Sequence, residues 1–435
     1  MEYTIYNATI VTIDSDNNIY SNGAIVIKDG TIVDIGNLSA DKFKGKLIDM
    51  HGKIVMPGLI NAHTHTHSPM FKNILDDMKL MEWLKKGLWP LEKKITAENA
   101  KNATECSCLE FIKNGITTYA DQFFYAKDIA EIAQKSGLRC FLAATVLTEG
   151  CAETKNTIGT AENFIKKWKG KEEQTLVYPC IGPHAPYSVS KEDWIKVLEI
   201  AEKYNVIIHT HISETKDENN QIKQKYGLTP TQWLNSMNIF SQKVLAAHSI
   251  HLTDEDIEIY KENNVSAIYN PVSNLKLVSG LMPIEKFYEK GVNVAIGTDG
   301  AQSNNSLDLL QDIKIGSLVQ KQKLEDATFL DATKSVRILT IEGAKALRME
   351  KEIGSLEIGK KADFISFNPK SINLKPLDIS NQKNIYSAIT YTITGADVED
   401  TVVNGKWLMK DKKVITLNEE EILEHIQKDS MEIRK

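Results

Sequence analysis

Three features of the sequence predict an α/β fold, a TIM-type (β/α)8 barrel with a small β-sandwich domain formed from both chain ends. Strand-like runs rich in β-branched residues alternate with amphipathic helical stretches over residues 58–345, a length that suits a barrel of about 250 residues. Short strand-like runs occupy residues 1–57 and return over residues 346–418. The 435 residues are enough for one large domain and one smaller one. We therefore expect the barrel to be inserted between the two halves of the small domain.

The individual barrel elements follow from hydrophobic runs that end in polar residues. The first barrel strand is expected at residues 55–60, where the apolar run is followed by histidines. Later strands are expected in four further runs, at 206–214, 243–252, 265–271 and 292–300. In the second half of the small domain, strands are expected at 362–367 and 400–413, before a charged C-terminal helix at 419–435.

Charge and cysteine content exclude several classes of protein. The formal net charge is -6 and no basic block is present, which argues against nucleic-acid binding. The five cysteines are odd in number and sparse, so we expect a reducing compartment rather than a disulfide framework. No secretion-type leader and no stretch of membrane-spanning length is apparent. We therefore expect a cytoplasmic protein with a small-molecule substrate and no nucleic-acid or membrane partner; a homo-oligomer is compatible with the sequence, which leaves the oligomeric state open.

Three alternating histidines are the strongest chemical signal. His63, His65 and His67 follow the first expected barrel strand. Residues two apart share one face of a strand, and barrel enzymes build their sites at the carboxyl ends of the strands. Two imidazoles on one face can bind a metal ion together. The sequence therefore predicts a metal site here without showing which two of the three histidines bind.

Later strands offer further ligands for the same ion. His209 and His211 share a face of one strand, with Glu214 just past its end. The next expected strand carries His248, and Asp299 lies in a Gly-Thr-Asp-Gly turn after another. Histidines and a carboxylate suit zinc, iron or a similar divalent ion. A closed structural zinc site is less consistent with the set, because such sites favour thiolates and no cysteine belongs to it.

An ordered series of motifs spans essentially the whole chain: PGLINAHTH, DDMKLMEWLKKGLWPLE, GITTYADQFF, GPHAPYSVS, HTHISET, LAAHSIHL, NPVSNLKLVSG, GTDGAQSNNSLDLL and IGSLEIGKKADF. With these motifs the sequence resembles the amidohydrolase superfamily, in particular the 5′-methylthioadenosine/S-adenosylhomocysteine deaminases, with the 5′-deoxyadenosine deaminases close by. Any one motif could arise by chance, whereas the ordered set is highly specific.

The resemblance implies one divalent ion, with zinc favoured and iron or manganese as alternatives. It implies four ligands, which are His63, His65, His211 and Asp299. Counting back from DDMKLMEWL leaves no net insertion when the first two of the three histidines form the HxH pair of the family. His211 stands three residues before Glu214, as in the family's HxxE. His67 and His209 are the alternative ligands, and the role of His251 is open.

The same resemblance implies roles for residues around the ion. Glu214, His248 and Asp299 would be catalytic, with Glu214 as the proton shuttle and His248 in contact with the hydrolytic water. Glu92 would accept hydrogen bonds from the ribose hydroxyls, and His184 and Glu214 would contact the substrate. Taken from the residues alone, Glu92 reads as a solvated acid at a helix start and His184 as a loop histidine between prolines.

The implied reaction is metal-dependent hydrolytic deamination of an adenosine-type nucleoside to the inosine analogue plus ammonia. The nearest alternative is an aminohydrolase or chlorohydrolase of another heterocycle, such as guanine, a pterin or a triazine. A binuclear amidase would need a bridging carboxylated lysine, for which no strand lysine is obvious. An inactive scaffold is hard to reconcile with a complete set of candidate ligands.

Two details bear on the substrate and on the site's surroundings. Relatives often carry an arginine in the strand after the GLR segment, which could meet an amino-acid carboxylate, whereas Ala143, Ala144 and Thr145 stand in this stretch. Methylthioadenosine, 5′-deoxyadenosine or adenosine is therefore favoured over S-adenosylhomocysteine, unless a cation such as Arg139 serves instead. For the polar turn NPVSN at residues 270–274, backbone capping is the simplest interpretation.

Overall fold

The computed structural model describes residues 1–78, 82–148 and 157–435. Two features discussed above fall outside the described residues: Cys151, and residues 79–81 within the DDMKLMEWL motif. Among the described cysteines, Cys106, Cys108, Cys140 and Cys180 are free thiols.

The barrel is built from parallel strands that follow one another in chain order. They are β6 (Leu59–His65), β7 (Ile116–Phe123), β8 (Arg139–Val146), β9 (Val177–Pro183), β10 (Ile208–Ile212), β11 (Val244–His248), β12 (Ser266–Tyr269), β13 (Val294–Ile296) and β14 (Asp299–Gly300). β13 pairs with β12, and β14 pairs with β6. These two short strands are the two halves of an eighth barrel strand, so they close the sheet on itself. This confirms the predicted barrel.

The barrel strands are buried on both faces because helices cover the outside and side chains fill the inside. All eight residues of β7 and of β8 are buried. The described α-helices are α2 (Trp89–Glu92), α3 (Ala97–Lys113), α4 (Ala126–Ser136), α5 (Thr157–Trp168), α6 (Glu172–Thr175), α7 (Lys191–Tyr204), α8 (Lys216–Tyr226), α9 (Pro230–Ser236), α10 (Asp254–Glu262), α11 (Pro271–Lys276), α12 (Ile284–Lys290), α13 (Ala301–Asn304), α14 (Leu309–Leu324), α15 (Ala332–Leu339), α16 (Ile341–Ala346), α17 (Gln382–Tyr391) and α18 (Glu419–Ile433).

Short helical turns join these elements. They are η1 (Ala40–Lys42), η2 (Ser68–Phe71), η3 (Trp83–Leu88), η4 (Ile239–Ser241), η5 (Ile372–Leu374) and η6 (Gly395–Asp397). Many helices begin at a side chain that accepts a hydrogen bond from the first turn, as Thr96 does at the start of α3. In the part of the chain that the structure describes, no helix is long and apolar enough to cross a membrane.

The two chain ends combine into one small β domain, as predicted. Its strands are β1 (Glu2–Val11), β2 (Ile19–Lys28), β3 (Thr31–Gly36), β4 (Lys46–Asp49), β5 (Ile54–Pro57), β15 (Phe364–Phe367), β16 (Val398–Val403), β17 (Lys406–Lys410) and β18 (Lys413–Val414). β5 joins the two ends, since it pairs in parallel with β1 and antiparallel with β15. The sheet has its own hydrophobic core, which includes Ile5, Ile25, Phe364 and Val402.

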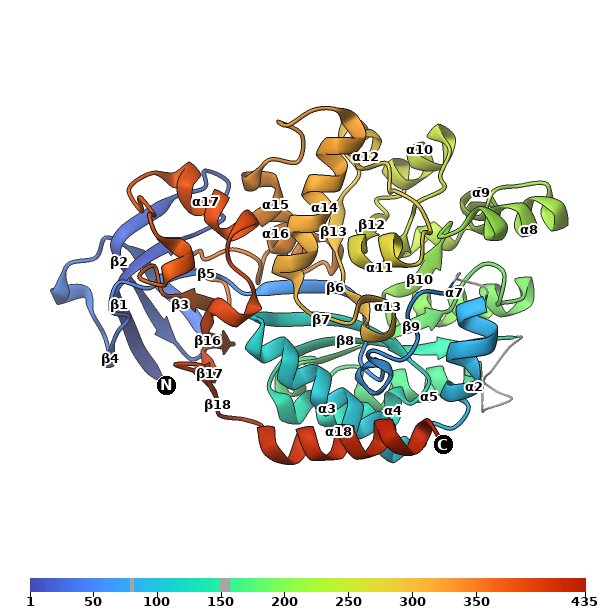
Figure 1. Cartoon of the computed structure of the whole chain (residues 1–435), viewed down its shortest axis with the longest axis horizontal. Coiled ribbons are helices and arrows are strands. Elements are labelled where there is room, and N and C mark those ends of the chain that lie inside the picture. Colours follow the sequence, from blue (N-terminus) through green and yellow to red (C-terminus); the bar gives the residue numbers. More distant parts are fainter. Residues whose placement is uncertain (79–81, 149–156) are drawn as a thin grey trace.

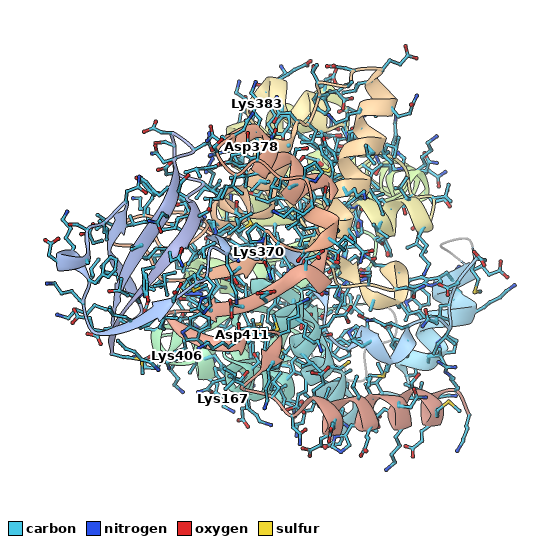
Figure 2. The ribbon with its side chains drawn as sticks, turned by 60° about the vertical axis from the view of Figure 1, so that its left-hand side comes forward. Lys167, Lys370, Asp378, Lys383, Lys406 and Asp411 are labelled. Carbon is cyan, nitrogen blue, oxygen red and sulfur yellow. The ribbon has the colours of Figure 1, made fainter. Side chains whose placement is uncertain are left out.

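The views show how the parts are arranged. Figure 1 places the blue and red strands of the small domain side by side, beside the barrel, with α18 running along the outside. Charged side chains of both signs are spread over the face shown in Figure 2, among them Lys406 at the start of β17 and Asp411 just after its end. The domain boundaries expected from the sequence remain a proposal; β5 ends at Pro57, and β6 begins at Leu59.

Candidate metal centre and substrate pocket

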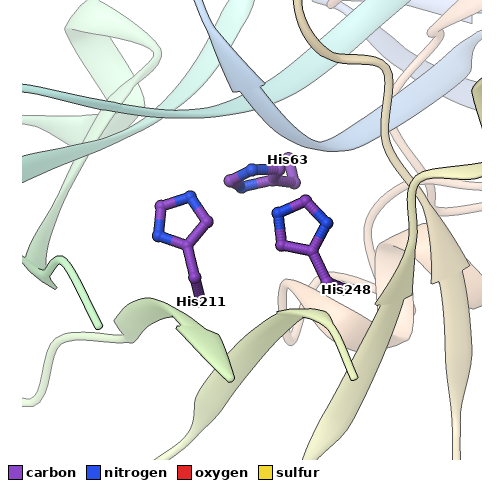
Figure 3. Close-up of side chains that lie close together, drawn as sticks. All are labelled: His63, His211 and His248. Carbon is purple, nitrogen blue, oxygen red and sulfur yellow. The ribbon is translucent and has the colours of Figure 1, made fainter. Parts of the chain in front are cut away.

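The candidate metal ligands meet at the carboxyl ends of the barrel strands. His63 and His65 end β6, and His211 lies near the end of β10. His248 is the last residue of β11, and Asp299 begins β14. Figure 3 shows the rings of His63, His211 and His248 converging from opposite sides of the barrel. Residues that are up to 236 positions apart are thus brought together by the closed sheet, as the sequence predicted.

The polar atoms of this cluster are spaced as ligands of one ion would be. The Asp299 Oδ1 atom lies 3.4 Å from the Nε2 atom of His63 and 3.4 Å from that of His65. The Nε2 atoms of His211 and His65 are also 3.4 Å apart. The Nε2 atom of His63 is buried without a hydrogen-bond partner among the described residues. An orphaned, buried acceptor surrounded by three other ligand-type groups fits a divalent cation.

The second nitrogen of each ring is anchored on the side away from the centre. His65 Nδ1 donates to the Gln122 carbonyl at 2.9 Å, and His211 Nδ1 donates to the His184 carbonyl at 2.7 Å. His63 Nδ1 lies 2.8 Å from His209 Nε2. These contacts fix the ring orientations and direct each Nε2 atom to the centre. His209 therefore lies behind His63 rather than at the centre.

The third histidine of the HTHTH motif is directed away from the cluster. His67 Nε2 lies 3.1 Å from the Glu92 Oε1 atom. His67 and Glu92 are thus in contact, although they lie 25 positions apart in the sequence. His251 is outside the cluster as well, and its Nε2 atom donates to the Ser279 carbonyl at 2.7 Å.

Burial and charge set the protonation states that a metal ion requires. Burial lowers the pKa of His63 to about 4, although Asp299 acts in the opposite direction. Burial raises the pKa of Asp299, but the interaction with His63 and the charges of the surrounding histidines outweigh it, and the pKa falls well below its ordinary value. Metal ligands must be neutral imidazoles and ionised carboxylates. The cluster holds both forms at neutral pH.

The turn after β12 supports Asp299 and His248 by hydrogen bonds. The prediction that this turn only caps the backbone is therefore wrong. Asn270 makes no side-chain capping hydrogen bond at the start of α11. Instead, Ser273 Oγ donates to Asp299 Oδ2 at 2.6 Å, and His248 Nδ1 donates to Asn274 Oδ1 at 2.8 Å. The signal in the sequence was the position of NPVSN directly after a barrel strand, where its side chains face the same barrel end.

Glu214 lies between the cluster and the pocket. Its Oε2 atom is 3.8 Å from His248 Nε2, and Ser279 Oγ donates to its Oε1 atom at 3.2 Å. The buried Glu218 carboxylate accepts the backbone N–H groups of Ser213 and Glu214 at 3.0 and 2.9 Å. Sequence reasoning missed Glu218, although its position three residues after Thr215, the N-cap of α8, matches the S/T-x-x-E pattern of a helix start.

A cavity of about 320 Å³ opens over the cluster. Its walls are mainly apolar and aromatic, and its polar groups include Glu92, His184 and Glu214. The apolar lining comes from Trp83, Leu88, Trp89, Phe123, Phe124, Leu147, Tyr187 and Leu277. An apolar cavity with a few convergent polar groups is typical of a small-molecule site.

Arg139 is at the other end of the barrel. It begins β8, and its guanidinium is buried in an ion pair with Asp363 at 2.7 Å. It therefore does not line the cavity, and the suggestion that it contacts a substrate carboxylate is wrong. In the described ranges, which omit 79–81 and 149–156, the residues that line the cavity include no lysine or arginine.

Comparison with known proteins gives a consistent result. The Amidohydrolase family model matches residues 54–408. The chain is 37% identical to the 5-methylthioadenosine/S-adenosylhomocysteine deaminase of Caldanaerobacter subterraneus subsp. tengcongensis, over 98% of both chains. It is 38% identical to the 5′-deoxyadenosine deaminase of Methanosarcina acetivorans, over 99% of this chain and 98% of the other. The structure of an adenosine deaminase from Xanthomonas campestris with bound zinc is similar, with a TM-score of 0.93 and 28% identity over 99% of this chain and 98% of that one.

Proposed function

Because the chain belongs to the amidohydrolase family, we propose that it hydrolyses the amino group from an adenosine-type nucleoside. One water molecule is consumed, and the products are the inosine analogue and ammonia. The observation that carries the proposal is the convergence of three histidines and one aspartate beneath an apolar cavity that also contains Glu214.

We assign His63, His65, His211 and Asp299 as the residues that hold one divalent ion, for which zinc is the best candidate. The orphaned Nε2 atom of His63 and the ionised state of Asp299 support this assignment. When bound, such an ion acts as a Lewis acid and lowers the pKa of a water molecule toward about 7. The other steps depend on side chains of the chain itself.

Three side chains would move or hold protons. Asp299 and His248 would accept and orient the proton of the attacking water, since both side chains line the same cavity over the cluster. Burial lowers the pKa of His248, but the charges of Glu214 and Asp299 outweigh it, and the pKa is raised overall. Glu214 would protonate the purine ring nitrogen beside the carbon that is attacked, which makes that carbon more electrophilic. The proton held by Asp299 and His248 would then pass to the amino group, which leaves as ammonia, and the hydroxyl proton on the attacked carbon would return to Glu214.

The cavity supports a nucleoside as the substrate. Glu92 and His184 line the cavity. This supports the roles proposed for them, in which Glu92 would accept hydrogen bonds from the ribose hydroxyls and His184 would contact the substrate. The His184 ring is anchored by Ser188 through a 2.8 Å contact at Nδ1, and burial lowers its pKa to about 4, so the ring is neutral. The apolar walls favour a small uncharged 5′ group, as in 5′-deoxyadenosine or 5′-methylthioadenosine, over the amino-acid group of S-adenosylhomocysteine.

The proton-shuttle role of Glu214 is tested by Glu214→Gln. We expect this variant to keep its metal content and to lose most of its ammonia release, because the amide cannot deliver the proton. Glu255→Gln on the exposed surface of α10 is the matched control and should remain active. Near wild-type turnover by Glu214→Gln would show that the assignment of the shuttle is wrong.

The substrate is tested by ammonia release from a panel that varies at the 5′ position. Adenosine, 5′-deoxyadenosine, 5′-methylthioadenosine and S-adenosylhomocysteine should be compared with guanine. Activity on guanine alone would favour the alternative of a nucleobase aminohydrolase.

We also propose that the protein works in the cytoplasm, which the free thiols support. Sedimentation of the intact chain would establish whether it forms a homo-oligomer.

A further inference from the structure

His67 is clamped at the edge of the cavity. Its ring stacks on Phe123 with the ring centroids 3.7 Å apart and the planes at 10°. Only 4% of its side chain is exposed. Phe123 is the last residue of β7, a fully buried barrel strand, so the ring packs against a side chain held by the barrel sheet. The position of the imidazole is therefore fixed independently of any ligand.

Among the described residues, the polar contact of this ring is with the Glu92 carboxylate. His67 Nε2 lies 3.1 Å from Glu92 Oε1, while His67 Nδ1 is buried without a hydrogen-bond partner in the part of the chain that the structure describes. A buried ring nitrogen without a partner is unfavourable. A histidine at this position therefore lowers the stability of the fold. This favours a role for the ring in the site, in addition to packing.

Few other contacts orient the Glu92 side chain. It is the last residue of α2, a helix of four residues, and its side chain is 18% exposed. Among the described residues, His67 is the side chain within hydrogen-bond distance of this carboxylate. A glutamate on such a short element would otherwise sample several rotamers. The fixed imidazole limits these rotamers, because its N–H can donate to only one oxygen of the carboxylate at a time.

We propose that His67 is a positioning residue that orients Glu92 toward the two ribose hydroxyls of the substrate. The inference rests on the proposed function and deepens it. An ionised carboxylate has about four acceptor positions. One is used by His67 on Oε1, which leaves Oε2 and the remaining positions for the 2′- and 3′-hydroxyl donors. Discrimination between ribosyl and dideoxyribosyl substrates then depends on His67.

Two substitutions separate the hydrogen bond from the packing. His67→Phe keeps an aromatic ring to stack on Phe123, removes the donor and also removes the unpartnered Nδ1 atom. His67→Gln loses the ring but can place an amide N–H near the former position of Nε2. Both variants should be measured on 5′-deoxyadenosine and on 2′,3′,5′-trideoxyadenosine, together with zinc content and melting temperature.

With His67→Phe we expect kcat/KM for 5′-deoxyadenosine to fall about tenfold, mainly through KM, because a hydrogen bond to a charged group is lost. The value for the trideoxy substrate and the zinc content should not change, and the melting temperature should not fall, because the variant also removes the unpartnered Nδ1 atom. His67→Gln should recover part of the loss. In a Glu92→Ala background, His67→Phe should cause no additional loss, since the two residues act as one unit.

An equal loss on both substrates, or no loss on either, would overturn the role of His67 while leaving the deaminase assignment intact. A full additional loss in the Glu92→Ala background would overturn it as well. If the wild-type protein releases no ammonia from any nucleoside in the panel, the proposed function fails, and this inference fails with it. Binding of inosine and 2′,3′-dideoxyinosine, followed by the fluorescence of Trp83 and Trp89 in the cavity wall, gives the same comparison without turnover.

Discussion

The contact between His209 and His63 gives one buried side chain a direct influence on a proposed metal ligand. His209 Nε2 is 2.8 Å from His63 Nδ1, and both rings are buried. Burial lowers the pKa of His209 well below its ordinary value, so its ring is neutral and can accept the N–H of His63. This hydrogen bond fixes both the tautomer and the orientation of His63.

We expect His209→Phe to weaken zinc binding by about 10–100-fold, the usual effect of removing a partner of a metal-bound histidine. Competition with a chromogenic chelator measures the affinity. His51→Phe, at a side chain that is 77% exposed, is the control and should bind zinc like the wild type. Complete loss of zinc, equal to that of His63→Ala, would make His209 a ligand, and unchanged affinity would remove its supporting role.

The candidate residues were predictable from the sequence, while their connections were not. Alternation left His63, His65 and His67 as candidates, and the resemblance to the family then favoured the first two. The same resemblance favoured His211, which stands three residues before Glu214. The contact between His67 and Glu92 depends on how α2, the short helix that ends at Glu92, packs against the barrel. The turns η2 and η3 lie between His67 and this helix in the chain. No local pattern encodes such a contact, because it is set by the packing of distant segments.

At the scale of elements, the loop after β10 is held in an unusual backbone conformation. Ser213 has φ of 52°, a left-handed value that is uncommon for residues other than glycine. The Glu218 side chain, in the first turn of α8, accepts the N–H groups of Ser213 and Glu214. This arrangement fixes the backbone from which the proposed proton shuttle extends.

We expect Glu218→Ala to lower kcat by about 10–100-fold, because small displacements of a catalytic group are costly. Zinc content should remain unchanged, since Glu218 contacts no proposed ligand. Asp217→Ala, an exposed acid in the same helical turn, is the matched control. Full activity of Glu218→Ala, measured as ammonia release, would show that Glu214 does not need this support.

Glu218 also gives the protein a defined pH dependence. Burial raises its pKa from 4.5 to about 7, although the two backbone hydrogen bonds act in the opposite direction. A carboxyl whose pKa is raised on folding stabilises the fold fully below its unfolded pKa, and this contribution is lost as the pH rises through the folded pKa. Glu218→Ala should therefore flatten the decline in stability between pH 4.5 and about 7.

The break in the last barrel strand was not predictable from hydrophobic pattern. Residues 292–300 read as one strand, whereas the structure divides it into β13 and β14 around Gly297. A Cβ atom at Gly297 would lie 2.6 Å from the His63 carbonyl oxygen, so only glycine fits there. The break lets Asp299 adopt a φ of 59° and turn its carboxylate to the histidines. Such strain is typical of functional sites.

At the scale of the whole molecule, the return of strand-like texture after the barrel correctly predicted that the two chain ends form one domain. The pattern could not show how that domain is attached. Arg139 at the start of β8 pairs with Asp363, just before β15, so a barrel strand is joined to the small sheet by buried charges. Lys53 forms a second cluster within the small domain, with Asp400 and Asp411 at 2.7 and 2.8 Å.

The buried pair between Arg139 and Asp363 should therefore hold the domains together without affecting the substrate. Its side chains are 1% and 3% exposed, and removing one partner of a buried pair costs about 3–5 kcal/mol. We expect Arg139→Met to lower the free energy of unfolding by that amount in urea titrations. Lys167→Met, at a surface pair with Glu131 whose side chains are 55% and 71% exposed, should cost under about 1 kcal/mol.

β8 contains eight residues, so Arg139 lies roughly 20 Å from the cavity at the other end of the strand. The KM ratio between S-adenosylhomocysteine and 5′-methylthioadenosine should therefore be the same in Arg139→Met and in the wild type, measured below the unfolding transition. A selective rise in KM for S-adenosylhomocysteine would instead place the guanidinium at the substrate. That outcome is incompatible with the buried pair, because one guanidinium cannot be at both ends of the barrel.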